Sequence, residues 1–170
     1  EINNFIKKVN AKGVCEVAND NAEGQIILSG NVEQIDNLKD ILKENKKKYI
    51  PLNVSAPFHC SLMKPAALKM QDKISSVKFQ KPNFDIVSNV TSIPEKDPES
   101  IKKLLVDQIC STVRWRESII NMNKENITDF IEIGPGKVLS GMVKRTVKNI
   151  NCFSINSIDD MKKTINELKK

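Results

Sequence analysis

The chain has 170 residues, of which 39% are hydrophobic and 28% are charged. This balance is typical of a globular protein with one ordinary domain or two small ones, and it excludes an intrinsically disordered chain. Its apolar runs are much shorter than the roughly 20 residues that cross a bilayer, so the sequence predicts no membrane segment.

The formal net charge is +6, carried mostly by lysine. Arginine occurs only at positions 114, 116 and 145, and aromatic residues make up 5%. A nucleic-acid surface usually clusters its cations and interleaves arginine or aromatic residues. We therefore interpret most lysines as solvated helix faces and expect no nucleic-acid partner. An acidic protein or a phosphate-bearing ligand fits a basic face at least as well as DNA.

The cysteines and the histidine argue against a metal centre. The four cysteines lie far apart in the sequence, at positions 15, 60, 110 and 152, without a C-x-x-C pair. The single histidine cannot complete a zinc site with them. We expect free thiols in a reducing compartment, which places the protein in the cytoplasm.

Residues 1–54 predict a small unit of helices and strands. The expected elements, in order, are a helix in 2–9, strands at 13–20 and 24–30, a helix from 31, and a strand at 47–54. Asn31 is expected as the N-cap, with Gln34 completing a capping box. The order α-β-β-α-β matches a ferredoxin-like unit that lacks its first strand. Together with Glu1 in place of an initiator methionine, this suggests that further sequence lies upstream.

Residues 55–170 alternate between helices and strands. The expected elements, in order, are a helix from about 60 to 77, a strand at 84–90, helices from 97 and 114, a strand–turn–helix over 129–145, a strand at 152–155 and a last helix with Ile158, Met161, Ile165 and Leu168 on one face. Such alternation is typical of a parallel sheet. The fold class is therefore predicted as α/β, with a second, larger part over 55–170.

His59 lies in the stretch VSAPFHCSLM, residues 54–63. Pro57 favours an extended Ala56, so the imidazole falls on a connection between a strand end and a helix start. In α/β sheets, reacting groups often meet at this edge. The alternative is an ordinary loop histidine with a satisfied hydrogen bond.

Four segments share a resemblance to one family. They are VSAPFHCSLMKPA (54–66), NDNAEGQIILSG (19–30), DQICSTVRW (107–115) and IEIGPGKVLSGMVKR (131–145). In order and spacing they resemble the motifs of malonyl-CoA:acyl carrier protein transacylases. The resemblance covers nearly the whole chain. It implies that residues 55–170 are the C-terminal part of the large, α/β-hydrolase-like acyltransferase subdomain, and that residues 1–54 are an incomplete ferredoxin-like subdomain.

The resemblance also implies a ping-pong acyl transfer in type II fatty-acid synthesis. His59 would be the general base and Gln108 the residue whose carbonyl orients the imidazole. Asn19, Asn21 and Asn89 would line the substrate pocket, although Asn19 and Asn21 are equally suited to stabilising a turn. The implied partners are malonyl-CoA and an acidic acyl carrier protein, with no cofactor, no metal and a monomeric complete protein.

One departure from the family is large. The nucleophile elbow G-x-S-x-G does not occur in these 170 residues. Ser55 and Ser61 flank His59 without the strand–turn–helix context of an elbow. Cys60 is adjacent to the histidine in sequence, and adjacent residues rarely face each other. We therefore expect the chain to resemble the C-terminal portion of such an enzyme and to be inactive alone.

Three alternatives remain open at this stage. An acyltransferase of polyketide synthesis, or one with another acyl specificity, fits the same motifs, although Phe58 favours the malonyl group by the same resemblance. A non-catalytic ferredoxin-like module that binds an acidic protein or RNA is less favoured, because the segments IIL and VCEV carry no aromatic residues. Separately, Gly134-Pro135-Gly136 is either an anion cradle at a helix start or a tight turn.

Overall fold

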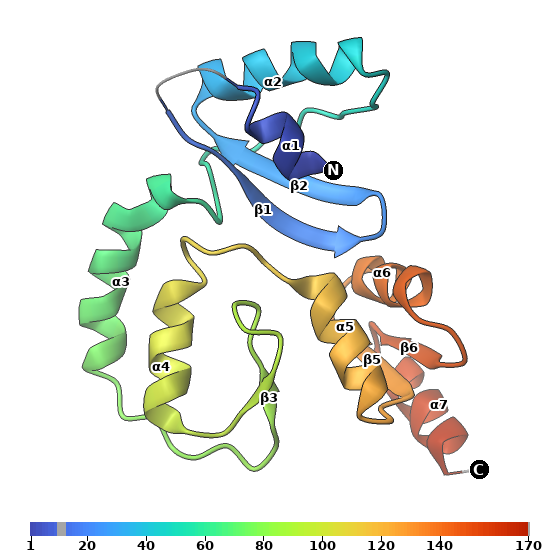
Figure 1. Cartoon of the computed structure of the whole chain (residues 1–170). Helices are drawn as coiled ribbons and strands as arrows, with labels where there is room; N and C mark the ends of the chain where they lie inside the picture. Colours follow the sequence, from blue (N-terminus) through green and yellow to red (C-terminus); the bar gives the residue numbers. More distant parts are fainter. Residues whose placement is uncertain (10–12, 170) are drawn as a thin grey trace.

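The computed structural model describes residues 1–9 and 13–169. Its first part consists of α1 (Ile2–Ile6), β1 (Cys15–Ala22), β2 (Gln25–Gly30) and α2 (Val32–Glu44). β1 and β2 pair antiparallel, and α2 contacts both β2 and α1 (Figure 1). Phe5, Leu38 and Leu42 are buried together between these elements and form the core of this hairpin unit.

The start of α2 differs from the predicted capping box. Asn31 is the N-cap residue, as expected, but its Oδ1 accepts a hydrogen bond from the backbone N–H of Val14, at 2.7 Å, instead of from the helix. Gln34 is only 2% exposed and packs into the unit. The asparagine therefore joins the chain before β1 to the start of α2, a contact that local spacing does not reveal.

Residues 47–54, predicted as a strand, form none in the part of the chain that the structure describes. Ile50, Leu52 and Val54 are 55–84% exposed. Alternating apolar residues favour a strand only where a neighbouring strand supplies hydrogen-bond partners. This strand prediction is wrong for the described chain, and the ferredoxin-like assignment of residues 1–54 stays a prediction.

The middle of the chain contains two packed helices and a short hairpin. Its elements are η1 (Ser61–Met63), α3 (Lys64–Ser75), β3 (Ile86–Val87), β4 (Pro94–Glu95) and α4 (Pro98–Asp107). α3 packs against α4, and β3 pairs antiparallel with β4. The predicted strand at 84–90 is shorter in the structure because the chain turns, with the N–H of Ser92 donating to the carbonyl of Ser88 at 2.8 Å.

The C-terminal part alternates as expected. Its elements are α5 (Trp115–Lys124), β5 (Asp129–Ile133), α6 (Val138–Thr146), β6 (Asn151–Ile155) and α7 (Ile158–Leu168). β5 and β6 are parallel. Ile119, Val143 and Val147 form a second buried core, against which Trp115 and Met122 pack.

This parallel sheet is open in the described chain. Parallel strands are usually buried on both faces, yet Ile133 on β5 is 80% exposed. The predicted apolar face of α7, formed by Ile158, Met161, Ile165 and Leu168, is 42–69% exposed. The helical periodicity therefore identified an apolar face of the kind that is usually buried, but among the described residues this face of α7 stays exposed.

The turn between β5 and α6 is held by a carboxylate of the chain. Glu132 accepts hydrogen bonds from the backbone N–H groups of Leu139 at 3.1 Å and Ser140 at 2.8 Å. An anionic group at a helix N-terminus satisfies its free N–H groups and interacts favourably with the helix dipole. Hydrogen bonds from the Ser140 side chain and backbone lower the pKa of Glu132 below its ordinary 4.5.

The glycines before α6 adopt backbone conformations that suit glycine. Gly134 and Gly136 have φ values of 135° and 97°. The N–H of Gly136 donates to Asn156 Oδ1 at 2.7 Å, and Pro135 has no N–H to donate. With Glu132 already accepting from the helix start, the segment is a tight turn stabilised by the chain's own side chains, and the anion-cradle interpretation is not favoured.

Glu132→Gln should lower Tm at neutral pH, because an amide replaces the ionised acceptor at the start of α6. A lowered pKa means that the folded state favours the ionised form. The stabilisation of the fold by the Glu132 carboxylate is therefore fully present above the unfolded-state pKa. It is lost as the pH falls through the folded-state pKa, which lies below 4.5. Thermal unfolding from about pH 7 to about pH 3 should show the two proteins converging in acid. The exposed control Glu125→Gln should show no such trend, and a pH-independent gap for Glu132→Gln would contradict the assignment.

Candidate active site

His59 lies in the loop that connects the hairpin unit to η1. Its backbone φ is 58°, in the left-handed region, which costs a non-glycine residue about 1 kcal/mol. The next residue, Cys60, is fully buried, and its Sγ–H donates to the carbonyl of Pro57 at 3.1 Å. The buried thiol therefore closes the turn and is engaged within it, while the imidazole of His59 is only partly buried.

A hydrogen bond to α4 fixes the orientation of the imidazole. Nδ1 of His59 is 2.9 Å from the backbone oxygen of Gln108, the C-cap residue of α4. A carbonyl oxygen only accepts, so we assign the proton to Nδ1, which leaves the lone pair of Nε2 free in the neutral ring. In this tautomer, Nε2 can take a proton from a hydroxyl or thiol brought next to it.

The predicted residues Gln108 and Asn89 lie in the same contact network. Gln108 Oε1 accepts a hydrogen bond from Asn89 Nδ2 at 3.4 Å. The backbone oxygen of Asn89 accepts from the N–H of Arg114 at 3.0 Å. The structure thus brings His59, Gln108 and Asn89 together, with the backbone carbonyl of Gln108 contacting the ring and its side chain contacting Asn89.

Asn19 and Asn21 lie elsewhere on β1. The bridge between Asn19 and Val113 joins β1 to the segment after α4, with backbone hydrogen bonds of 2.8 and 2.9 Å that involve Ala18 and Asp20. Asn21 is buried. A cleft lies beside His59, and neither Asn19 nor Asn21 is among the residues that line it. The structure therefore does not bring these two asparagines to the histidine, and their substrate-binding role stays a prediction.

An open cleft of about 730 Å³ lies beside His59. Its walls come from α1, β1, β2, the His59 loop, the segment between α4 and α5, and the start of α5. They are formed by Ile2, Asn3, Ile6, Cys15, Glu16, Val17, Asp20, Ile26, His59, Cys110, Thr112, Arg114, Arg116 and Glu117. The volume is within the range of small-molecule sites. His59 therefore lines a space large enough for part of a substrate.

Two arginine–carboxylate pairs line this cleft. Arg116 donates through Nε and Nη2 to the two carboxylate oxygens of Asp20, at 2.9 and 2.6 Å, and this contact raises the pKa of Arg116. These two hydrogen bonds connect the start of α5 to β1. The two residues are 96 positions apart in the sequence and no local pattern links them, so this pair could not be predicted.

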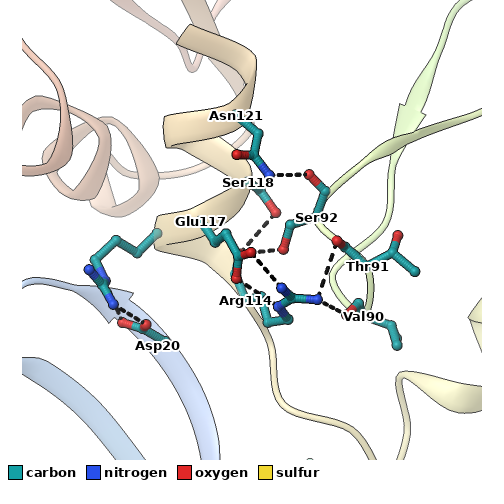
Figure 2. Close-up of polar contacts among 9 residues, drawn as sticks. Asp20, Val90, Thr91, Ser92, Arg114, Glu117, Ser118 and Asn121 are labelled. Carbon is teal, nitrogen blue, oxygen red and sulfur yellow. Dashed lines mark hydrogen bonds and ion pairs between the residues drawn. The ribbon is translucent and has the colours of Figure 1, made fainter. Parts of the chain in front are cut away.

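Arg114 joins α5 to the turn that carries Asn89. Figure 2 shows its guanidinium donating to the carbonyls of Val90 and Thr91, at 3.0 and 3.3 Å, and pairing with Glu117 one helical turn away. Buried backbone carbonyls need such partners. The three-residue spacing of Arg114 and Glu117, which is typical of an ion pair on a helix, is a sequence signal that could have located this pair.

The same turn is bound to α5 through Ser92. This buried serine donates to the backbone oxygen of Arg114 at 3.3 Å, and its own carbonyl accepts from Asn121 at 3.0 Å (Figure 2). Ser118 donates to the same Arg114 oxygen at 2.9 Å. These contacts hold the turn, and with it Asn89, next to Gln108.

The cleft also contains two thiols. Cys15 and Cys110 line its wall. Burial raises the pKa of both thiols, so they are neutral at pH 7 and weakly nucleophilic. A raised pKa is the opposite of what an activated thiol nucleophile needs.

Within residues 1–9 and 13–169, no group of three histidine, cysteine, aspartate or glutamate side chains is arranged to hold a metal ion. Over the same residues, no helix has the length and apolarity needed to cross a membrane.

Comparisons with individual known proteins place the chain in a family, although no family model matches it. The chain is 38% identical over 165 residues to the malonyl CoA-acyl carrier protein transacylase of Bacillus subtilis, which covers 96% of this chain and 52% of that protein. It is 33% identical over 145 residues to the transacylase of the same name from Synechocystis, covering 85% and 49%.

Solved structures agree with these relatives. The acyl-carrier-protein-S-malonyltransferase of Bartonella henselae superposes with a TM-score of 0.94 at 35% identity, over 99% of this chain and 54% of that one. A malonyl-transacylase in complex with a type II PKS acyl-carrier protein gives 0.92 at 32% identity, over 98% and 54%. These matches confirm the α/β fold. The chain spans about half the length of the curated relatives it matches. By sequence and by fold, it belongs to the malonyl-CoA:acyl carrier protein transacylase family.

Proposed function

We propose that this chain is part of a malonyl-CoA:acyl carrier protein transacylase of fatty-acid synthesis, with His59 as its general base. The observation that supports this most is the hydrogen bond from Nδ1 of His59 to the backbone oxygen of Gln108, which leaves Nε2 available beside an open cleft. A general base needs a defined tautomer and access to the proton it accepts.

The proposed reaction has two similar halves. Nε2 of His59 takes the proton of a serine hydroxyl as the serine oxygen attacks the malonyl thioester carbonyl. The tetrahedral intermediate collapses, the C–S bond breaks, and the CoA thiolate receives the proton from Nε2. In the second half, the phosphopantetheine thiol of the carrier protein gives its proton to Nε2 and attacks the acyl-serine carbonyl. The ester C–O bond then breaks, and the serine oxygen takes the proton back from Nε2.

A neutral orienting group suits this chemistry. The carbonyl of Gln108 stabilises an imidazolium less than the carboxylate of a serine protease would. A thiolate is a better leaving group than an amine, so less assistance is needed. Gln108 is therefore proposed as a positioning residue, and Asn89, which contacts its side chain, as the part of the substrate pocket nearest to it.

The serine nucleophile is proposed to come from the part of the family fold that this chain does not span. The elbow motif is absent from the 170 residues. Ser61, two positions after His59, donates its hydroxyl to Glu16 at 2.7 Å and is engaged there. The proposed enzyme would therefore be complete only with the serine-bearing half.

The proposed substrates are malonyl-CoA and an acidic acyl carrier protein. The net charge of +6 is complementary to such a carrier and to the phosphates of coenzyme A. Asn19 and Asn21 are also proposed to contact the substrate, at a position separate from His59. A cytoplasmic, monomeric complete protein remains the expectation.

A polyketide carrier is the second candidate. One structural relative was solved with a type II PKS acyl-carrier protein, so the fold alone does not decide which carrier protein is used. Comparing transfer rates to a fatty-acid carrier and to a type II polyketide carrier at equal concentration separates the two.

Replacing His59 by Ala in the full-length protein should lower kcat by about 10²–10⁴-fold, because the hydroxyl and thiol protons lose their acceptor. Radiolabelled malonyl transfer to the carrier protein measures the rate. Lys69→Ala, an exposed residue on α3, is the matched control and should retain normal turnover. Undiminished transfer by the His59 variant would refute the assigned role.

The 170-residue chain alone should transfer malonyl groups no faster than buffer, because it carries no elbow serine. A fusion of this chain to the half of the Bacillus subtilis relative that it does not match should transfer measurably, since that half supplies the serine and a partner for the uncovered apolar faces. The same malonyl transfer assay compares the two proteins. Normal turnover by the chain alone would show that the nucleophile lies within it.

A further inference from the structure

Glu16 on β1 holds the loop that carries His59. Its Oε2 accepts a hydrogen bond from the backbone N–H of Ser61 at 2.8 Å, and its Oε1 accepts from the Ser61 hydroxyl at 2.7 Å. Ser61 begins η1 and lies two residues after His59. A carboxylate that accepts two hydrogen bonds is a stronger anchor than a neutral acceptor.

The His59 loop needs such an anchor. Residues 47–54 precede it without a strand partner in the described chain, and His59 itself has a left-handed backbone conformation. A strained residue of this kind persists only where its surroundings hold it. Burial of Cys60 fixes one side of the turn, and the contact between Ser61 and Glu16 fixes the other.

β1 also positions the partner of the imidazole. The segment after Gln108 binds the same strand, because Thr112 Oγ1 donates to the carbonyl of Val17 at 2.6 Å and Val113 N–H donates to the carbonyl of Ala18 at 2.8 Å. Residues 16, 17 and 18 of one strand therefore hold both sides of the bond between His59 and Gln108. The spacing of these three residues along β1 therefore sets the distance between the His59 loop and the segment after Gln108.

We propose that Glu16 is a positioning residue for His59: its carboxylate fixes the histidine turn to β1, so that Nδ1 meets the carbonyl of Gln108 and Nε2 faces the cleft. The structural part of this inference stands on the hydrogen bonds. Its catalytic consequence rests on the proposed function.

The structural part is tested on this chain, whose single histidine gives unambiguous ring-proton NMR signals. In Glu16→Ala, both ring-proton shifts should move at least halfway toward their values in the urea-unfolded chain, while circular dichroism shows a folded protein. Ser61→Ala, which removes one of the two hydrogen bonds, should give a smaller displacement. Glu44→Ala, an exposed glutamate at the end of α2, is the control and should give none.

Unchanged ring shifts in a folded Glu16→Ala protein would overturn the proposal. If that variant fails to fold, Ser61→Ala decides, because its unchanged shifts would overturn the proposal equally.

Kinetics in the full-length protein tests the catalytic part. Glu16→Ala should lower kcat about tenfold, with a much smaller change in KM for malonyl-CoA, because a displaced base slows proton transfer while the other residues that line the cleft stay in place. Glu16→Gln, which keeps one acceptor oxygen, should recover part of the loss. An unchanged kcat would overturn the positioning role. If the full-length wild-type protein transfers no malonyl group, the proposed function fails, while the ring-proton shifts still report on the contact of Glu16.

Discussion

The hydrogen bond between Nδ1 of His59 and the backbone oxygen of Gln108 is the contact on which the proposed chemistry depends. The carbonyl belongs to the C-cap of α4, where a helix leaves oxygens without partners, so the imidazole satisfies an acceptor that would otherwise need water. In return, the ring is held in one tautomer and one orientation. Geometry, and not a neighbouring carboxylate, makes this loop histidine a candidate base.

The rest of the site maintains that geometry through β1 and α5. β1 contacts the His59 loop through Glu16 and the segment after α4 through Val17 and Ala18. From α5, Arg116 pairs with Asp20 on the same strand, and Arg114 binds the turn that carries Asn89. Half-exposed ion pairs contribute little stability singly. Their value here is that they connect segments distant in sequence around one cleft.

The sequence predicted the parts of this arrangement that have local signals. Helical periodicity located α4 and α5. Asp97, at which the first of these helices was predicted to begin, is the N-cap of α4 and accepts a hydrogen bond from the N–H of Ser100 at 2.7 Å. The proximity of His59, Gln108 and Asn89 could be predicted only through the family resemblance, because the three residues come from different segments. That resemblance was confirmed, whereas the catalytic roles it implies remain proposals.

The remaining features could not be predicted from local patterns. Asn31 was expected to cap α2, but its side chain meets Val14, and the strand at 47–54 lacks a partner in the described residues. The apolar face of α7 was identified, yet it is exposed because periodicity marks a face and not what covers it. Glu16 carries no motif signal at all, since its partner lies on another segment of the chain.

The most direct test of the proposed geometry is the position of the proton on the single histidine, observed by long-range ¹H–¹⁵N correlation on the wild-type chain in alkaline solution. We expect the proton on Nδ1 and a free lone pair on Nε2. A ring protonated on Nε2, or one that averages between both tautomers as free histidine does, would contradict it.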